Sequence, residues 1–487
     1  MSKHALSLDS SDCWPVSRPA LLVLAVFTCI VIVGYVAHDP WRDELQAWNM
    51  ARDMSLFDLI RNAGNEGHPI GWHVLIKPLS MLALPFESLR IMNLILALAA
   101  VFLYFRYAPF SPWFKSLLVC TAPFVFVLLN ARVYSLIAFL MMLQSCLYRS
   151  RLRSPWPYAI SLAVLANTVV LCFPYVLLSA WLWIKSARAA HVKNVVLPAF
   201  CFLCAAFFGA VIQIIPSIAK IESIINSRFV IINNLLSSFD TVFIFLIITF
   251  VIIFFFFARF LWSFSNNFSL LVIVSILFFL CIHLFVYSLS LYHIVVFAFI
   301  LHASVWICWS DISISLLRKN FLILKYMYCL LNILALLSSA HIVFIEATQN
   351  NSNVIKAVPF VRKYLSQLPV AGHSMSKVSS LSALIPGMKI WNPVTQEWGS
   401  FAVFDERWQR SRHTPMDEVV AAIFEQCDAF RPVLILSERW STPLSHEYRL
   451  VFVADSETVY DEDFFIYVPV ERVVPGMPIL SDTATTS

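Results

Sequence analysis

The stretch VFIFLIITFVIIFFFF (residues 242–257) contains no charged side chain and lies in a predominantly apolar run from 239 to 258. An α-helix needs about 20 apolar residues to cross the hydrocarbon core of a bilayer. Over all 487 residues, 60% are hydrophobic and only 13% are charged, whereas a soluble domain has about 25% charged residues. The sequence therefore predicts a polytopic α-helical membrane protein.

The composition also excludes several classes of function. The nine glycines form neither G-x-G-x-x-G nor G-x-x-x-x-G-K-[ST], so the chain lacks the common loops that bind nucleotide phosphates. The formal net charge is only +5 and no basic run resembles a nucleic-acid-binding face, so we expect no nucleic-acid partner. Most of the 11 cysteines fall in apolar segments, where a thiol acts as a small hydrophobe.

Apolar runs predict about eleven membrane-spanning helices. They cover residues 19–37, 88–105, 116–130, 132–148, 157–171, 173–184, 194–215, 239–258, 268–287, 290–309 and 321–343. We separate the fifth from the sixth at Phe173-Pro174, because a single helix of that length would be too long for the bilayer. With a cytoplasmic N-terminus, the basic connections fall on the inner side, as the positive-inside rule requires. The loop 38–87 and the C-terminal tail are then extracytoplasmic.

The tail differs in composition from the rest of the chain. It contains 17 of the 29 acidic residues. Its short alternating or apolar runs predict strands near 401–405, 432–438, 449–455 and 463–470, and its periodicity predicts a helix over 416–430. We therefore predict a transmembrane domain at 1–343 and a small extracytoplasmic α/β domain at 344–487.

The first external loop, residues 38–87, concentrates the carboxylates of the membrane part. It holds seven acids, against three from 88 to 342. The seven are Asp39, Asp43, Glu44, Asp53, Asp58, Glu66 and Glu87. Polar groups gathered at one membrane face of an apolar bundle mark the default position for a functional site.

Within this loop, the sequence predicts a helix over 41–53, with Trp41, Leu45 and Trp48 on one face. Adjacent residues on a helix diverge by about 100°, so Asp43 and Glu44 can have different roles. One can accept a proton while the other orients a ligand or pairs with an arginine. The alternative is a solvated amphipathic helix on the membrane surface.

These motifs resemble the C-type glycosyltransferase (GT-C) superfamily, which includes protein O-mannosyltransferases and lipid A aminoarabinose transferases. The resemblance rests on WRDELQAW (41–48), EGHPIGWH (66–73), NARVYSL (130–136) and LYH (291–293). It is closest to an uncharacterised bacterial branch whose first loop reads W-x-D-E-x-Q-A-W and E-G-H-P. That branch tends to have Arg-His where this chain has Tyr292-His293.

The resemblance implies an inverting transfer of one monosaccharide at the outer face of the bacterial inner membrane. The donor would be a polyprenyl-phosphate sugar, and the acceptor a glycan, a glycolipid or a protein. An acidic pair in the first external loop is the shared catalytic feature of the superfamily. This resemblance assigns the role of general base to Asp43, with Glu44 as the second choice. Glu66 would bind or position the acceptor.

The leaving phosphate needs cations and hydrogen-bond donors at the same membrane face. Arg132 is the first candidate because it lies between two predicted helices at their external ends, and Tyr134, Tyr292 and His293 can add donors. The alternative for Arg132 is an interfacial arginine whose stem lies along apolar surface. The predicted substrate-binding residues in the first loop are Trp41, Arg52, His68 and Lys77. For His68, a turn-capping role is the alternative.

We expect no cofactor. Asp43, Glu44, Glu66 and His68 offer ligands suited to Mg²⁺ or Mn²⁺, but their spacing matches no defined metal motif. The main alternative function is a transporter or flippase of a lipid-linked sugar, although such proteins usually carry repeated halves with polar features at mid-membrane. An assembly protein of an envelope complex is a third reading.

Overall fold

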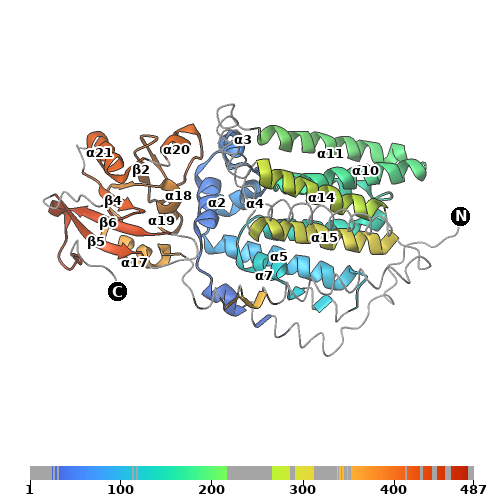
Figure 1. Ribbon diagram of the computed structural model, residues 1–487, viewed down its shortest axis with the longest axis horizontal. Coiled ribbons are helices and arrows are strands. Elements are labelled where there is room, and N and C mark those ends of the chain that lie inside the picture. The colour runs from blue at the N-terminus through green and yellow to red at the C-terminus, as the bar shows by residue number, and fades with distance from the viewer. Residues whose placement is uncertain are drawn as a thin grey trace, which may run out of the picture. The chain divides into compact units, whose positions relative to one another are not determined.

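The computed structural model describes residues 32–111, 115–116, 119–215, 266–285, 291–311, 352–411, 414–427, 431–440, 447–455 and 462–480, with residues 25, 28, 29, 337, 339–341, 343, 344 and 348 beside them (Figure 1). Contacts divide the chain into two compact units. The helical unit comprises residues 1–35, 67–72 and 92–343, and the α/β unit comprises 36–66, 73–91 and 344–487.

Among the described residues, three helices are long and apolar enough to cross a membrane: Glu87–Tyr107 (α5), Val170–Ala189, and Lys193–Gln213 (α11). The segment Val170–Ala189 joins the short 3₁₀-helix η3 (Val170–Cys172) to α10 (Phe173–Ala189). Shorter apolar helices occur at Pro155–Ala166 (α9) and at His293–Ile307. The predicted spans 19–37, 239–258 and 321–343 lie wholly or largely outside the described residues.

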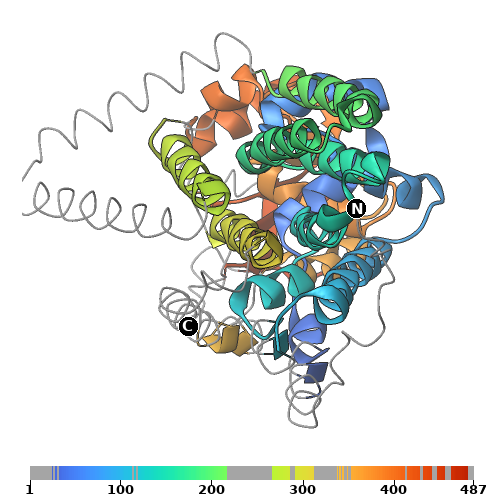
Figure 2. The same ribbon diagram turned by 90° about the vertical axis from the view of Figure 1, so that its right-hand side faces the viewer.

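Six helices of the helical unit pack in a closed ring. Each helix contacts the next in the order α8 (Tyr134–Leu147), α9, α11, α10, α14 (Asn266–Phe285) and α15 (Leu291–Asp311). Helix α15 also contacts α8, which closes the ring. Figure 2 shows these helices nearly end-on. Aromatic pairs such as Tyr158 with Trp183, whose ring centroids are 5.2 Å apart, fill the space between neighbours.

A break between the fifth and sixth predicted spans is present, but it lies at residues 167–169, because η3 and α10 run on from Val170 through Phe173-Pro174. Helix α9 ends at Ala166 and α10 begins at Phe173, with Pro174 in its first turn. Proline is well placed there because the first-turn N–H groups have no partner within the helix. A second predicted break, between 130 and 132, is also present, since α7 (Ala122–Leu129) ends just before it and α8 follows.

The α/β unit is built on a mixed six-stranded sheet of order β3-β2-β1-β4-β6-β5. The strands are β1 (Val370–Gly372), β2 (Ile390–Asn392), β3 (Glu397–Gly399), β4 (Val433–Leu436), β5 (Tyr448–Ala454) and β6 (Phe464–Pro469). Strand β1 pairs in parallel with β2 and β4, and the remaining pairs are antiparallel. The carboxyl ends of β1, β2 and β4 therefore lie at the same edge.

Helices cover both faces of this sheet (Figure 1). On one face, α21 (Met416–Cys427) buries Val420 and Ile423 in a core with Leu434 and Leu436 of β4. On the other face, α17 (Val354–Tyr364) packs on β5 and on α19 (Ser380–Leu384), next to the short α18 (Met375–Val378).

The α/β unit also contains most of the first loop, which the sequence analysis grouped with the membrane domain. Helix α2 (Arg42–Asp53) packs on α18 and α19, and α3 (Leu56–Glu66) follows it. The predicted apolar face is buried, with exposed fractions of 3% for Trp41, 0% for Leu45 and 2% for Trp48. Trp48 packs on Phe86 of the same loop, and the neighbouring face of α2 holds the tail, where Gln46 and Asn49 donate hydrogen bonds to tail carbonyls.

The strands predicted near 432–438, 449–455 and 463–470 are confirmed as β4, β5 and β6, and the helix predicted over 416–430 is confirmed as α21 up to Cys427. The strand predicted at 401–405 is wrong. Both backbone polar groups of Ala402 bond to the Gln46 side chain instead of to a strand. The Ala402 N–H donates to Gln46 Oε1 at 3.0 Å, and Gln46 Nε2 donates to the Ala402 carbonyl at 2.7 Å. An amide side chain thus takes the position of a neighbouring strand.

Candidate functional site

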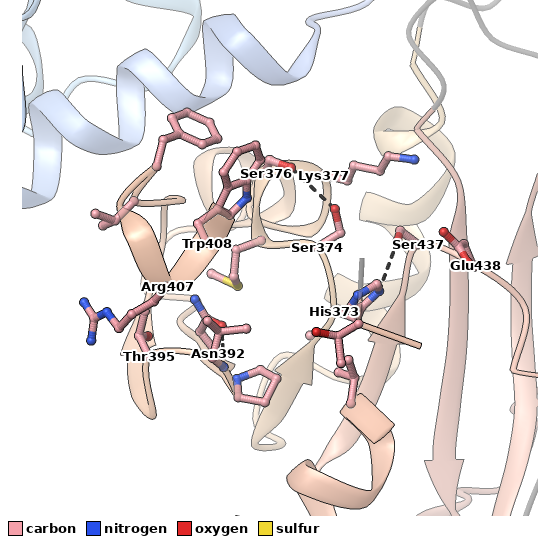
Figure 3. A pocket seen from close by; sticks show the side chains of 18 of the residues that line it. His373, Ser374, Ser376, Lys377, Asn392, Thr395, Arg407, Trp408, Ser437 and Glu438 are labelled. Atoms are coloured by element: carbon pink, nitrogen blue, oxygen red, sulfur yellow. Dashed lines mark hydrogen bonds between the residues drawn. The ribbon is translucent and has the colours of Figure 1, made fainter. Parts of the chain in front are cut away.

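A cavity of about 770 Å³ opens in the α/β unit at the carboxyl ends of β1, β2 and β4 (Figure 3). Ligands of open α/β sheets bind in this position, in the crevice beyond the carboxyl ends of the strands. The volume is in the range of about 300–1,000 Å³ that is typical of small-molecule sites. The first turns of α2, the α18 turn, α20 (Glu406–Ser411) and α21 complete its wall.

The loop after β1 forms one side of the cavity and is tightly held. A Cβ atom on Gly372 would lie 2.7 Å from Val378 Cγ2 and 2.8 Å from Ile390 Cγ2, so only glycine fits. Ser374 has a left-handed backbone (φ 57°), a conformation that a serine keeps only when its surroundings impose it. The loop is therefore preformed rather than shaped by a ligand.

His373 lies beside Ser437 on the wall of this cavity, with Nδ1 and Oγ 3.4 Å apart (Figure 3). Burial lowers the pKa of His373, the Glu438 carboxylate opposes that shift, and Lys377 adds to it. The imidazole is therefore neutral at neutral pH, and it can both donate and accept hydrogen bonds.

The opposite side of the cavity is aromatic. The rings of Phe404 and Trp408 pack edge to face with centroids 4.8 Å apart. Asp405 holds this segment, because its carboxylate accepts the Trp408 N–H at 3.1 Å and the Arg407 Nε–H at 2.9 Å. An aspartate that precedes a helix in this way is a strong N-cap.

The two adjacent acids of α2 have different environments. Asp43 lines the cavity with its side chain 40% exposed, and its Oδ1 lies 3.8 Å from Arg42 Nε. Glu44 is fully buried; its Oε2 accepts the Trp41 N–H at 3.2 Å and lies 3.4 Å from His38 Nε2. Glu44 therefore stabilises the first turn of α2, and Asp43 is the acid that can meet a ligand.

Polar side chains of α2 fix the helix against the tail. Asn49 is fully buried, and its Nδ2 donates to the Ser379 carbonyl at 2.9 Å and to the Ser400 carbonyl at 2.6 Å. Burial by itself would raise the pKa of Asp53, but hydrogen bonds from Arg52 and from the Ser400 hydroxyl lower it below its usual value. Together with the Gln46–Ala402 pairing, these contacts determine where Asp43 lies.

Several residues predicted to bind substrate make contacts that support the fold, and their substrate-binding role stays a prediction. Lys77 Nζ donates to the Ala51 carbonyl at 2.9 Å and to the Met54 carbonyl at 2.5 Å, which caps the end of α2. Arg52 donates two hydrogen bonds to Asp53, at 2.9 and 2.8 Å, and a third to the Ser382 carbonyl at 3.0 Å. These cations and the buried Trp41 are not among the residues that line the cavity.

Glu66 and His68 flank the turn that follows α3. Glu66 is the last residue of α3, and its Oε1 lies 3.4 Å from Asn62 Nδ2. Gly67 has φ 75°, the left-handed conformation that commonly ends a helix. Glu66 belongs to the α/β unit and His68 to the helical unit, and neither lines the cavity.

The predicted phosphate-binding residues belong to the helical unit. Arg132 precedes α8, and its guanidinium carbon lies 5.8 Å from the centre of the Tyr134 ring. His293 is in the first turn of α15 and interacts electrostatically with Arg132. The structure thus places Arg132 and Tyr134 at the N-terminal end of α8 and His293 at that of α15, and the two helices pack on each other. Tyr292 is in the same turn, but its side chain lies outside the described residues.

The tail side of the cavity was not predicted from the sequence; it comprises His373, Ser374, Lys377, Trp408 and Ser437. One sequence pattern indicates the loop that contains His373. The apolar run PVAG (369–372) ends in a glycine followed by polar residues, which is typical of a short strand entering a functional loop. Trp408 follows an Asp-Glu-Arg N-cap pattern, but nothing in the sequence places it beside α2.

Within the described ranges, no three His, Cys, Asp or Glu side chains are grouped as a metal site would require. The expectation that the protein works without a metal stays a prediction. No family model, no curated protein and no solved structure matches the chain.

Proposed function

We propose that the chain is an integral-membrane glycosyltransferase of about eleven membrane-spanning helices, which moves a monosaccharide from a polyprenyl-phosphate donor to an acceptor outside the membrane. The observation that carries this proposal is the different placement of two adjacent acids: Asp43 lines a cavity of small-molecule size, and Glu44 is buried as a helix-capping residue. The resemblance of residues 41–48 to the GT-C first-loop motif supplies the reaction.

The proposed reaction is a single displacement with inversion. The Asp43 carboxylate takes the proton of an acceptor hydroxyl, and the oxygen attacks the anomeric carbon of the donor sugar. The new glycosidic C–O bond forms as the bond between that carbon and the phosphate oxygen breaks. The electron pair leaves with polyprenyl phosphate. A positioned general base contributes about 10²–10⁴-fold to such a step.

A leaving phosphate requires positive charge and hydrogen-bond donors. We assign this role to Arg132, with Tyr134 and His293 as neighbours that can donate hydrogen bonds. Two features support the assignment. Arg132 and Tyr134 lie at the N-terminal end of α8 and His293 at that of α15, a helix that packs on α8, and the N-terminal ends of helices favour anions. The group lies in the unit that contains the apolar helices, as a lipid-linked donor would require.

The test compares envelope glycans, by mass spectrometry, from cells that carry the intact gene and from cells that lack it. The proposal predicts that one sugar substituent disappears with the gene and returns only with an intact Asp43. Purified protein in vesicles separates this function from transport, because a flippase would move labelled polyprenyl-phosphate sugar across the bilayer without forming a glycosidic bond. Movement without bond formation would contradict the proposal.

A further inference from the structure

The cavity beside Asp43 has two sides of different chemistry. Phe404 and Trp408 form an aromatic side (Figure 3). The rest of the wall presents hydroxyl, amide and imidazole groups. These groups belong to His373, Ser374, Ser376, Asn392, Thr395 and Ser437.

This combination suits a sugar ring. A pyranose has an apolar face of C–H groups, which packs on an aromatic ring, and a rim of hydroxyls that both donate and accept hydrogen bonds. Trp408 supplies a large rigid surface of the first kind. The serine and threonine hydroxyls and the Asn392 amide match the hydroxyl rim of the sugar, because each can donate and accept hydrogen bonds.

The charges of the cavity favour a neutral ligand over a phosphate. Three cationic and three anionic side chains line it, so the opposing charges balance. They are Arg42, Lys377 and Arg407 against Asp43, Glu418 and Glu438. Burial keeps the pKa of His373 below its usual value, so this residue adds no positive charge at neutral pH. A phosphate group would meet as many carboxylates as cations here, so the cavity offers it no net positive charge.

The walls of the cavity are rigid. Asn49 and Gln46 pin the α2 side to the tail, and the close packing of Gly372 and the left-handed Ser374 pin the loop after β1. A preformed site loses little conformational entropy when a ligand binds. This small entropy cost matters most for the affinity of an uncharged ligand that makes only weak contacts.

We propose that this cavity binds the acceptor of the reaction as a neutral saccharide, with the Trp408 indole as the surface on which the sugar ring stacks and with a sugar hydroxyl directed at Asp43. The inference rests on the proposed function and deepens it. It narrows the acceptor to one that presents a sugar, as a glycan or a glycolipid does. An unglycosylated protein acceptor would not fit.

The test measures binding to the full-length protein in detergent by saturation-transfer difference NMR. The probes are methyl glycosides of mannose, glucose, galactose and N-acetylglucosamine, and the disaccharides maltose and cellobiose. At least one probe should bind saturably, and Trp408→Ala should weaken its binding at least tenfold. Trp408→Phe keeps an aromatic ring and should lose less. Trp398→Ala, at a 41% exposed tryptophan of β3 that does not line the cavity, should bind as the wild type does.

A second variant guards against misfolding of the Trp408 variants. Ser376→Ala removes one cavity hydroxyl whose described contact is Ser374 Oγ at 3.4 Å, and it should weaken binding several-fold without changing the thermal midpoint. The proposal is overturned if no probe binds, if binding is indifferent to both Trp408→Ala and Ser376→Ala, or if inorganic phosphate occupies the cavity and the sugars do not.

Asp43→Asn separates this inference from the proposed function. The variant should still bind the sugar saturably, with a loss of affinity smaller than that of Trp408→Ala, and should lower kcat by about 10²–10⁴-fold. Normal binding with normal transfer would remove Asp43 as the base and leave the saccharide site intact. Normal transfer by Trp408→Ala, together with absent sugar binding, would remove the saccharide site and leave the enzyme assignment intact.

Discussion

The backbone N–H of Arg42 donates a 2.8 Å hydrogen bond to the carboxylate of Glu462, 420 positions away in the chain. Glu462 also accepts a hydrogen bond from the Ser352 hydroxyl, and its side chain is fully buried. This acid of the tail therefore fixes the residue that precedes Asp43. The start of α2, which carries the proposed base, depends on a contact that no local pattern reveals.

The buried Glu462 predicts a pH dependence of stability. Burial raises its pKa to about 7, against 4.5 for a free side chain, and the hydrogen bonds from Ser352 and Arg42 only partly offset this shift. The folded protein then binds more protons than the unfolded chain between these values. Its stability should fall as the pH rises from about 4.5 to 7, by about 3 kcal/mol in total.

Glu462→Gln keeps a hydrogen-bond acceptor but removes this titration. The thermal midpoint of the wild type should decrease from pH 5 to pH 7.5 more than that of the variant, as measured by differential scanning fluorimetry. Parallel curves for the two proteins would show that Glu462 titrates normally.

Asn49→Ala should loosen α2 from the tail. The substitution leaves the Ser379 and Ser400 carbonyls without the Asn49 donor, and an unsatisfied buried polar group costs about 1–3 kcal/mol. We expect a lower thermal midpoint and faster proteolytic cleavage in the loop. Asn65→Ala, on the half-buried part of α3, is the control and should change both by much less. Equal effects of the two substitutions would contradict the docking role of Asn49.

Gly372→Ala should damage the cavity. The new methyl group would lie under 3 Å from Val378 and Ile390, and overpacking of this kind costs about 1–3 kcal/mol. Gly209→Ala, within α11, is the matched control because no atom lies within 4 Å of its added Cβ. The control should be neutral or slightly stabilising, since alanine favours helices by about 1 kcal/mol over glycine. A wild-type thermal midpoint for Gly372→Ala would refute the close packing.

Arg132→Gln should weaken donor binding. A charge-assisted hydrogen bond is worth about 1.5–3 kcal/mol, so the KM for the polyprenyl-phosphate sugar should rise at least tenfold. Arg132→Lys keeps the charge but loses the planar donor geometry, and its effect should be intermediate. Arg106→Gln, at the end of α5 beside Tyr107, is the control and should leave KM unchanged. An unchanged KM for Arg132→Gln would remove the phosphate assignment.

Much of the local structure follows from periodicity. The shared face of Trp41, Leu45 and Trp48 predicted the helix α2, and the Phe173-Pro174 step predicted the start of α10. The same face also predicts the position of Glu44. Glu44 lies three residues after Trp41 and four before Trp48, on the buried stripe, so its inward position was readable.

The assembly of the α/β unit was not readable from the sequence. Ala402 pairs with Gln46 across 356 positions, and an alternating run such as 401–405 gives no sign that its partner is an amide side chain. The three-residue strands β1, β2 and β3 are too short to show a period. Long-range polar contacts of this kind bring the tail residues to Asp43.

The most direct test of the account is sugar transfer by Asp43→Asn and Glu44→Gln, measured with the purified full-length protein and a radiolabelled polyprenyl-phosphate sugar. Asp43→Asn should lower kcat by about 10²–10⁴-fold with an unchanged thermal midpoint, because a half-exposed carboxylate contributes little to stability. Glu44→Gln should lower the thermal midpoint and retain measurable kcat. Transfer by Asp43→Asn at the wild-type rate would contradict the account.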